Sequence, residues 1–258
     1  MLAPQRQAAI LERVRARGAV RVSDLVAEFG VSDMTIRRDL EVLADRGLVS
    51  KVHGGATAVQ PGSTDEPGFA AKAIRQRAEK RAIAAAAAQL VKPGTAVALS
   101  AGTTTAELAR RLVEVPELTV VTNSIPVADV FYKAGRTDQT VVLTGGVRTP
   151  SDALVGPVAV AAIRSLHLDM LFLGVHGMSE RAGFTTPNLM EADTNRALVA
   201  AAERLVVVAD HTKWGTVGIS SIAALDDAHV LVTDSGLAAP AREVLADAVG
   251  ELIVAEAR

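Results

Sequence analysis

From Thr95 onward the chain alternates short apolar runs with segments of helical pattern, and this alternation constrains the fold more than any other feature. The runs are rich in β-branched residues and contain few polar positions: TAVALS, LTVV, TVVLT, DMLFLG, RLVVVA, HVLVT and ELIVA. Strands that are apolar along their whole length are typical of sheets covered on both faces. Because helical segments separate these strands, the pattern indicates parallel pairing through right-handed crossovers. We therefore expect an α/β domain with a mainly parallel sheet.

The N-terminal residues follow a different pattern, with three short helices and a hairpin. Gly18, Gly30 and Gly47 stand where these helices are expected to end, and Ser23 and Ser32 stand where the second and third are expected to begin. The segment LVSKVHGGA then alternates apolar residues before a Gly-Gly pair, which indicates a small hairpin. Two helices joined by the tight turn FGVS, followed by a hairpin, predict a winged helix-turn-helix.

The third helix has the composition of a DNA-reading helix. Ile36, Leu40 and Leu43 recur at helical spacing and are expected to face inward. The residues left outside can meet base edges in a major groove, where Arg bonds guanine and Met or Thr meets a thymine methyl: Asp33, Met34, Thr35, Arg37 and Arg38. Contacts to DNA phosphates are expected from Ser32, Arg6, Lys51 and His53. The competing interpretation is that the adjacent arginines only form a solvated helix face. The serine cap and the basic hairpin disfavour this interpretation.

Composition and charge divide the chain in the same place. Residues 1–58 hold nine Lys and Arg against seven Asp and Glu, whereas the remaining residues hold 18 against 22. We expect a winged helix-turn-helix over 1–57, a linker over 58–72 and a ligand-binding and oligomerisation domain over 73–258. The chain has no cysteine, no apolar run long enough to span a bilayer and no secretion signal, so a cytoplasmic protein without membrane association is expected.

The stretch LSAGTTTAELA joins an expected strand to an expected helix and is the best candidate for a ligand site. Ligands of open α/β sheets bind beyond the carboxyl ends of strands, and a helix N-terminus there attracts phosphate. Ala101, Gly102, Thr103 and Thr104 form this turn. Gly102 would admit an oxyanion closely, and the threonine hydroxyls would add donors. The competing interpretation is that the threonines only cap the helix.

Other strand ends add polar groups to the same expected edge. Asn123 would bond a sugar hydroxyl, Lys213 would supply a charge for phosphate, and Glu191 would accept hydrogen bonds or only stabilise a helix start. Gly145 and Gly146 close a further strand and complete the expected effector site. His176 and His211 lie on separate strand ends without metal-ligand spacing, so we expect neither a metal nor a cofactor.

The N-terminal segment VSDLVAEFGVSDMTIRRDLEVLADRGLVSKVHGGA resembles the helix-turn-helix motif of the DeoR family of bacterial transcription regulators. The matching residues are Val31, Ser32, Thr35, Ile36, Arg37, Arg38, Asp39, Leu40, Leu43, Gly47, His53, Gly54 and Gly55. AGTTT, VVTNS, TGG, MEAD and ADHTK with its trailing WG are similar to that family's effector domain, which is related in fold to ribose-5-phosphate isomerase and glucosamine-6-phosphate deaminase. The resemblance implies operator binding and a phosphorylated sugar or related metabolite as signal.

Two residues qualify this resemblance. Many family members have aspartate where this chain has Ser100, so the usual ligand or its pose is expected to differ. Asp39, beside two arginines, is expected either to orient Arg38 or to form a solvated pair of little energetic consequence.

We therefore expect a ligand-responsive repressor that binds double-stranded operator DNA as a homo-oligomer, either a dimer or a tetramer. A sugar-phosphate isomerase or deaminase is the alternative, because Glu191, Asp210, His211 and Lys213 could move a proton. The acidic cluster that such enzymes present is absent from the sequence, so we expect no enzyme. A constitutive architectural DNA-binding protein is a third possibility, and the gathering of polar strand ends argues against it.

Overall fold

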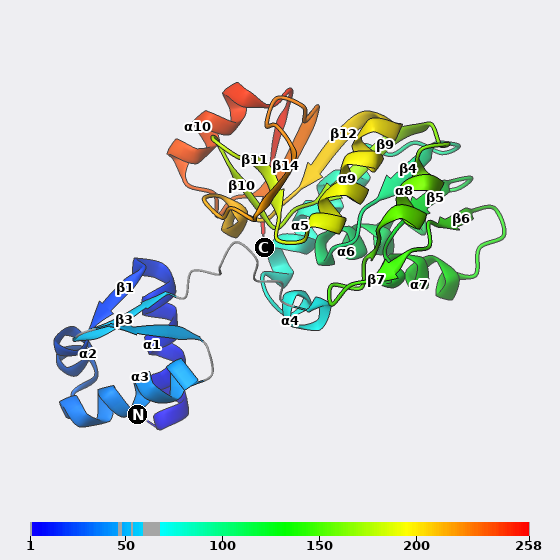
Figure 1. Ribbon diagram of the computed structural model, residues 1–258. Coiled ribbons are helices and arrows are strands. Elements are labelled where there is room, and N and C mark those ends of the chain that lie inside the picture. Colours follow the sequence, from blue (N-terminus) through cyan, green and yellow to red (C-terminus); the bar gives the residue numbers. More distant parts are fainter. Residues whose placement is uncertain (1, 46–47, 53, 59–67, 258) are drawn as a thin grey trace. The chain divides into compact units, whose positions relative to one another are not determined.

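A computed structural model describes residues 2–45, 48–52, 54–58 and 68–257, with the backbone alone at residues 15–17 and 58. The chain divides into two compact units, Met1–Pro61 and Gly62–Arg258. Figure 1 shows both units.

The first unit is a bundle of three helices with a three-stranded antiparallel sheet, in the order β1-β3-β2. Its elements are α1 (Ala3–Arg17), β1 (Ala19–Arg21), α2 (Val22–Phe29), α3 (Asp33–Asp45), β2 (Val49–Val52) and β3 (Gly55–Ala58). The helices bury Ile10, Val14, Leu25, Ile36 and Leu40 in a common core. This is the expected winged helix-turn-helix, and the inward orientation of Ile36, Leu40 and Leu43 is confirmed.

One strand and one cap of this unit differ from the prediction. Strand β1 pairs with β3 and runs directly into α2, so Arg21 occupies the N-cap position. The prediction that Ser23 caps this helix is therefore wrong, because Ser23 already lies in the first turn and its hydroxyl bonds Asp24. The neighbouring strands approach so closely that a Cβ on Gly55 would stand 2.1 Å from Val20 O, which excludes any side chain there. Gly47, expected to end α3, lies outside the described residues.

The core of the second unit is a seven-stranded parallel sheet in the order β15-β14-β12-β9-β4-β5-β6. In chain order these strands are β4 (Ala96–Leu99), β5 (Thr119–Thr122), β6 (Thr140–Leu143), β9 (Leu168–Gly174), β12 (Ala202–Val208), β14 (Val230–Asp234) and β15 (Leu252–Ala255). They coincide with the seven apolar runs of the sequence. The expected α/β fold with a mainly parallel sheet is thus confirmed.

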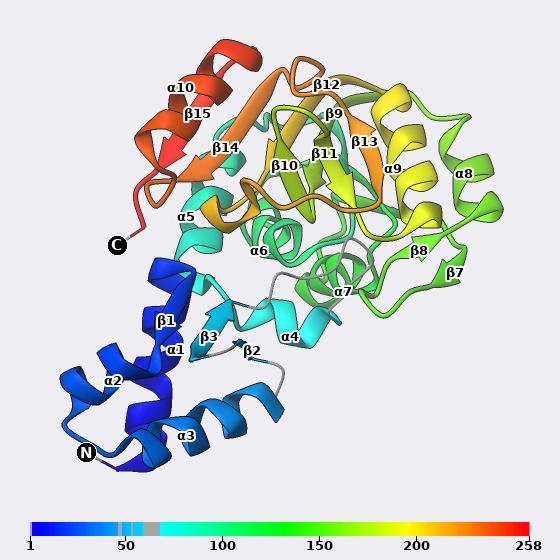
Figure 2. The ribbon, with the colours of Figure 1, turned by 60° about the vertical axis from the view of Figure 1, so that its left-hand side comes forward.

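Helices cover both faces of the sheet (Figures 1 and 2). One face packs against α5 (Arg77–Ala88), α6 (Thr103–Leu112) and α7 (Ile125–Ala134). The other packs against α8 (Pro157–Ile163), α9 (Leu189–Ala201) and α10 (Ala239–Ala248). Neighbouring residues along a strand face opposite cores: Val206 lies in one and Val207 in the other. A short helix, α4 (Phe69–Ala73), precedes α5, and a 3-10 turn, η1 (His211–Lys213), follows β12.

Two smaller sheets interrupt the alternation and were not anticipated. The first is antiparallel, β10 (Gly177–Ser179), β11 (Gly183–Thr186) and β13 (Ser220–Ala223), and the second is the pair β7 (Val147–Arg148) and β8 (Leu154–Val155). The edge strand β6 also departs from expectation, because Val141, Val142 and Leu143 are exposed by 36–46%. An apolar run predicts a strand, but it does not distinguish an edge strand from a central one.

Asp39 of α3 forms an internal tie in the first unit. Its side chain is 5% exposed, and Arg6 Nε and Gln7 Nε2 of α1 donate to its two oxygens over 2.6 and 2.9 Å. Both expectations for Asp39 are thus wrong, since it neither orients Arg38 nor forms a solvated pair. The expected phosphate contact of Arg6 is also wrong, because the Arg6 side chain is 9% exposed and its guanidinium donates to Asp39.

Asp39→Ala would leave the Arg6 guanidinium buried opposite an apolar methyl group. Breaking one side of a buried ion pair costs about 3–5 kcal/mol. We expect the first unit to unfold at a markedly lower denaturant concentration than in the wild type. Hydrogen exchange of residues 2–45 measures this unfolding. Asp33→Ala is the matched control, because it removes the partner of an exposed ion pair on the same helix and costs at most about 1 kcal/mol. Equal losses in the two variants would contradict the assigned role of Asp39.

Candidate functional site

The turn between α2 and α3 fixes the start of the helix expected to read DNA. Ser32 Oγ accepts a hydrogen bond from the Thr35 backbone N–H at 3.2 Å and lies 2.8 Å from Thr35 Oγ1. Ser32 is therefore the N-terminal cap of α3, as predicted. Gly30 ends α2 with a left-handed φ of 63°, which lets the chain reverse before this cap.

The exposed face of α3 carries the residues expected at base edges. Met34 is 75% exposed, and Arg37 and Arg38 are exposed on the following turn. Arg37 forms a bidentate pair with Asp33, so its guanidinium is held at the helix surface. Arg38 forms no ion pair among the described residues. Thr35 is half-buried, with its hydroxyl directed at Ser32.

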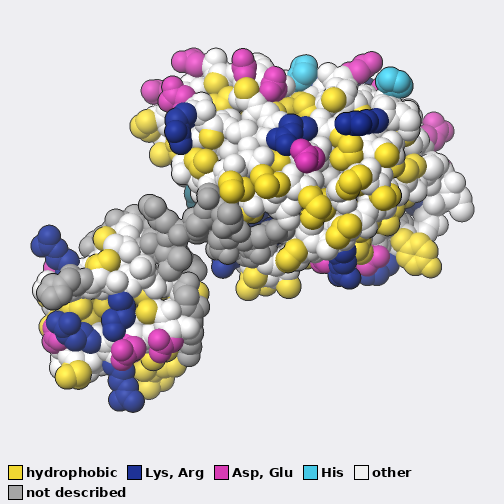
Figure 3. Space-filling view, in the orientation of Figure 1, with side chains coloured by type: hydrophobic (Ala, Val, Ile, Leu, Met, Phe, Trp, Pro, Cys, Tyr) yellow, Lys and Arg dark blue, Asp and Glu magenta, His cyan; other side chains and the backbone are white. Residues whose placement is uncertain are grey.

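The hairpin adds one described cation to this unit. Lys51 is exposed on β2, and its Nζ lies 3.2 Å from Glu41 Oε1 of α3, so the wing and the exposed helix are joined by a weak surface pair. His53 lies outside the described residues. Figure 3 shows Lys and Arg side chains at several points on the visible face of the first unit, with acidic side chains among them.

The second candidate site is the turn between β4 and α6. Gly102 occupies the N-cap of α6 with extended backbone, and no side chain caps the helix. The first-turn N–H groups of a helix have no intrahelical partner, so they are available to a ligand. Thr105 closes the turn from inside by donating its hydroxyl to Ser100 O at 2.7 Å and to Gly102 O at 3.0 Å. Thr103 is half-buried and Thr104 is 7% exposed.

Several polar residues at this edge hold strand ends together instead of facing solvent. Asn123 is fully buried: its Oδ1 accepts from Ala101 N (2.9 Å), and its Nδ2 donates to Leu154 O (3.1 Å). The structure therefore commits both Asn123 and the Ala101 amide to the protein itself, in contrast to the expected ligand contacts. Ser100 is also fully buried and accepts from Gly174 N at 2.9 Å, which joins the ends of β4 and β9.

The remaining expected effector residues lie at the ends of other elements. Gly145 and Gly146 precede β7 with left-handed φ values of 72° and 122°, and a Cβ on Gly146 would meet Val155 O at 2.6 Å. Glu191 is half-buried in the first turn of α9, where its N–H donates to the Asn188 cap. Lys213 is half-buried at the end of η1.

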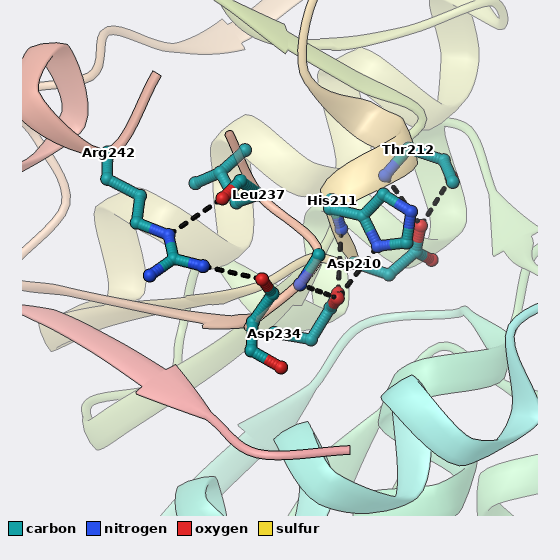
Figure 4. Close-up of polar contacts among 8 residues, drawn as sticks. Asp210, His211, Thr212, Asp234, Leu237 and Arg242 are labelled. Carbon is teal, nitrogen blue, oxygen red and sulfur yellow. Dashed lines mark hydrogen bonds and ion pairs between the residues drawn. The ribbon is translucent and has the colours of Figure 1, made fainter. Parts of the chain in front are cut away.

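The ends of β12 and β14 form a polar cluster that sequence reasoning only partly identified (Figure 4). Asp234 is 1% exposed; it accepts from the backbone N–H of His211 (2.8 Å) and of Gly236 (2.9 Å), and its Oδ2 lies 2.7 Å from His211 Nδ1. Asp210 accepts from the backbone N–H and the hydroxyl of Thr212. Asp234 directly follows the run HVLVT, so the strand-end criterion applied to Lys213 could have identified it.

A buried lysine that sequence reasoning missed lies near this cluster. Lys80 of α5 is 4% exposed, and burial lowers its pKa from 10.5 to about 8. Asp210 opposes this shift, and the positive charge of Lys213 adds to it. Its position inside an alanine-rich helix carries no signal for a binding role.

One cavity lies away from the Gly102 turn. A cavity of about 710 Å³ is lined by residues of the β10–β11 turn, β13 and the end of α10, and none of the expected effector residues lines it.

Across the described ranges, no three His, Asp or Glu side chains are grouped so that they could hold a metal ion. None of the described helices is long and apolar enough to cross a bilayer.

Comparison with known proteins identifies both units. The sequence model of a DeoR-like helix-turn-helix domain matches residues 6–61, and that of a DeoR C-terminal sensor domain matches residues 75–235. A ribose-5-phosphate isomerase in complex with phospho-erythronic acid shares 13% identity and a TM-score of 0.39 over 52% of each chain.

Curated relatives cover nearly the whole chain. The uncharacterized regulator YgbI of Escherichia coli is 36% identical over 99% of each chain. The regulator GlpR of Haloferax volcanii is 36% identical over 96% of each. The transcriptional repressor AccR of Agrobacterium fabrum is 34% identical over 90% of this chain and 89% of its own. Together with the two domain matches, these similarities mean that the chain belongs to the DeoR family of transcriptional regulators.

Proposed function

We propose that this protein is a repressor whose operator binding is modulated by a phosphorylated sugar or a related anionic metabolite. The observation that carries the proposal is the Gly102 turn, where an uncapped helix N-terminus lies at the carboxyl edge of a parallel sheet. The exposed face of α3, in a separate unit, supplies the DNA-binding surface. The signal is therefore received in one unit and acts on the other.

The proposed DNA contacts follow from the exposure of each side chain. Arg38 and Arg37 would reach base edges in the major groove, and Met34 would contact a thymine methyl. Arg37 first has to release Asp33, or keep it as a support that orients the guanidinium. Ser32, Thr35 and Lys51 would contact phosphates, as would His53, and Asp33 would border the contact. A single helix reads too few base pairs for selectivity, so two copies related by two-fold symmetry are proposed.

The proposed effector contacts use a subset of the residues expected from sequence. The α6 first-turn amides, the hydroxyls of Thr103 and Thr104 and the ammonium of Lys213 would bind the phosphate. Glu191 would accept a hydrogen bond from a sugar hydroxyl, and Gly145 and Gly146 would border the ligand. Asn123 and Ala101 would act by fixing the turn, since their polar groups are paired within the protein. Ser100 would likewise position the turn through its bond with Gly174.

We infer that the protein has no isomerase or deaminase activity. Proton transfer next to a carbonyl needs a carboxylate base placed against the reacting C–H, and the proposed role of Glu191 is only to accept a hydrogen bond from a sugar hydroxyl. Asp210 and Asp234 are both 1% exposed and accept hydrogen bonds from backbone N–H groups, which favours a supporting role for them. The regulator names of the relatives support the same inference.

Arg38→Ala is expected to reduce discrimination between the operator and random DNA by about 5- to 150-fold, because a bidentate base contact contributes about 1–3 kcal/mol. The operator is first selected from random duplexes with the full-length protein, and affinities are then measured by fluorescence anisotropy at fixed salt. Arg13→Ala is the control, since Arg13 is a partly exposed arginine that pairs with Glu28 away from α3. Undiminished discrimination in Arg38→Ala would mean that another surface reads the DNA.

Thr103→Ala combined with Lys213→Ala is expected to keep operator affinity but to weaken effector binding by at least tenfold. Each residue supplies a hydrogen bond to a charged group, worth about 1.5–3 kcal/mol. Thermal shifts with a panel of sugar phosphates measure effector binding. Fluorescence anisotropy with and without the sugar phosphates then measures operator binding. Thr140→Ala combined with Lys92→Ala removes the same chemical groups from exposed positions and should change neither. A normal effector response in the first double variant would place the phosphate elsewhere.

A further inference from the structure

Lys80 connects the start of the second unit to its carboxyl edge. Its Nζ donates to Lys72 O at 2.6 Å and to Arg75 O at 2.7 Å. These carbonyls lie in the last turn of α4 and just after it, so the ammonium caps the end of that helix. An ammonium has three N–H donors. Among the described residues these two carbonyls are its only hydrogen-bond partners, which leaves one donor for another acceptor.

The α4 segment is attached to the body by further contacts. Phe69 N donates to Pro150 O at 3.3 Å, and Lys72 Nζ lies 2.7 Å from Ser151 Oγ. Helix α4 also packs against α6, the helix that begins at the Gly102 turn. It is the first described element of the second unit, so the chain from the DNA-binding unit enters the body here. Any change in how α4 is held therefore acts on the part of the body that is nearest in sequence to the first unit.

The charges around Lys80 are unbalanced. Lys72 and Arg75 of the α4 segment and Lys213 of η1 are positive, and Asp210 is the negative group that acts on Lys80 from the end of β12. The Asp210 carboxylate also accepts hydrogen bonds from Thr212. Burial and the three neighbouring cations lower the pKa of Lys80 to about 8, so the neutral form is populated at pH 8. An added dianion would relieve this imbalance and favour the charged form.

We propose that Lys80 is a positioning residue that couples anion binding at the Gly102 turn to the attachment of α4. The inference rests on the proposed effector site and names its route of regulation. When a phosphate dianion lies at the turn, Lys80 is held as an ammonium and its bonds to Lys72 O and Arg75 O become charge-assisted. Proton uptake therefore accompanies effector binding, and α4 is held more tightly in the bound state. A lysine that only capped α4 would bind no additional proton when the anion arrives.

The test measures proton uptake by the full-length protein at pH 8, with a pH indicator in weakly buffered solution. Sulfate, which has no titrating proton at this pH, and glucose 6-phosphate are the probes. We expect both dianions to cause uptake of a fraction of a proton at pH 8. With sulfate the uptake should decrease toward zero at pH 6, where Lys80 is already charged. Glucose 6-phosphate is used at pH 8 only, because its phosphate is partly protonated at pH 6. Lys80→Gln should abolish the uptake, whereas Lys92→Gln, an exposed lysine, should retain it.

Hydrogen exchange of residues 68–76 provides the second readout. Binding should slow exchange in the wild type and leave it unchanged in Lys80→Gln. Lys80→Arg keeps a permanent charge, so it should restore slow exchange without proton uptake, and it also serves if Lys80→Gln does not fold. Anion binding by the wild type at pH 8 without proton uptake would overturn the proposal for Lys80 alone. If neither dianion nor any sugar phosphate raises the melting temperature, the effector site and the coupling both fail.

Discussion

Seven parallel strands end at one edge of the sheet, and the backbone groups they leave there must be bonded. In this protein polar side chains at the strand ends bond backbone groups at this edge: Thr122 donates to Leu99 O, Ser100 accepts from Gly174 N, and Asp234 accepts from Gly236 N of the loop that follows. An unpaired buried polar group costs about 1–3 kcal/mol, so these residues are needed for stability before any ligand is present. These bonds hold the strand ends together, so the proposed effector would meet amides that are already in place.

Polar residues at the strand ends can either stabilise the fold or face a ligand, and this limits how much of the candidate site could be predicted from sequence. The strand-end rule selected Asn123 and Lys213 equally, because it places residues at an edge without telling which way each side chain points. In the structure Asn123 is fully buried and paired, whereas Lys213 is half-buried. Lys80 was missed because nothing in an alanine-rich helix marks one lysine as buried. Such assignments depend on long-range contacts that a local pattern does not contain.

The fold was predictable to a similar depth, for the same physical reason. Period and apolar content identified all seven parallel strands and the inward face of α3. Strands β10, β11 and β13 were missed, since they are short and include Gly177, Ser179 and Gly183, which weaken the apolar pattern. The burial of Asp39 was missed because its partner, Arg6, lies 33 positions away on another helix. Local rules identify elements, whereas pairings between distant residues appear only in the folded chain.

The tie between Arg6 and Asp39 also bears on how mutations in this protein should be interpreted. This ion pair holds α3 against α1, although both side chains are buried and neither can contact DNA directly. Substitutions at either position are therefore expected to impair repression in a genetic screen, as are substitutions of the groups proposed to contact bases. A surface drawn through all residues whose substitution impairs repression would then be larger than the surface that contacts DNA. Sorting the two kinds requires a stability measurement on each variant, because loss of repression alone is the same for both.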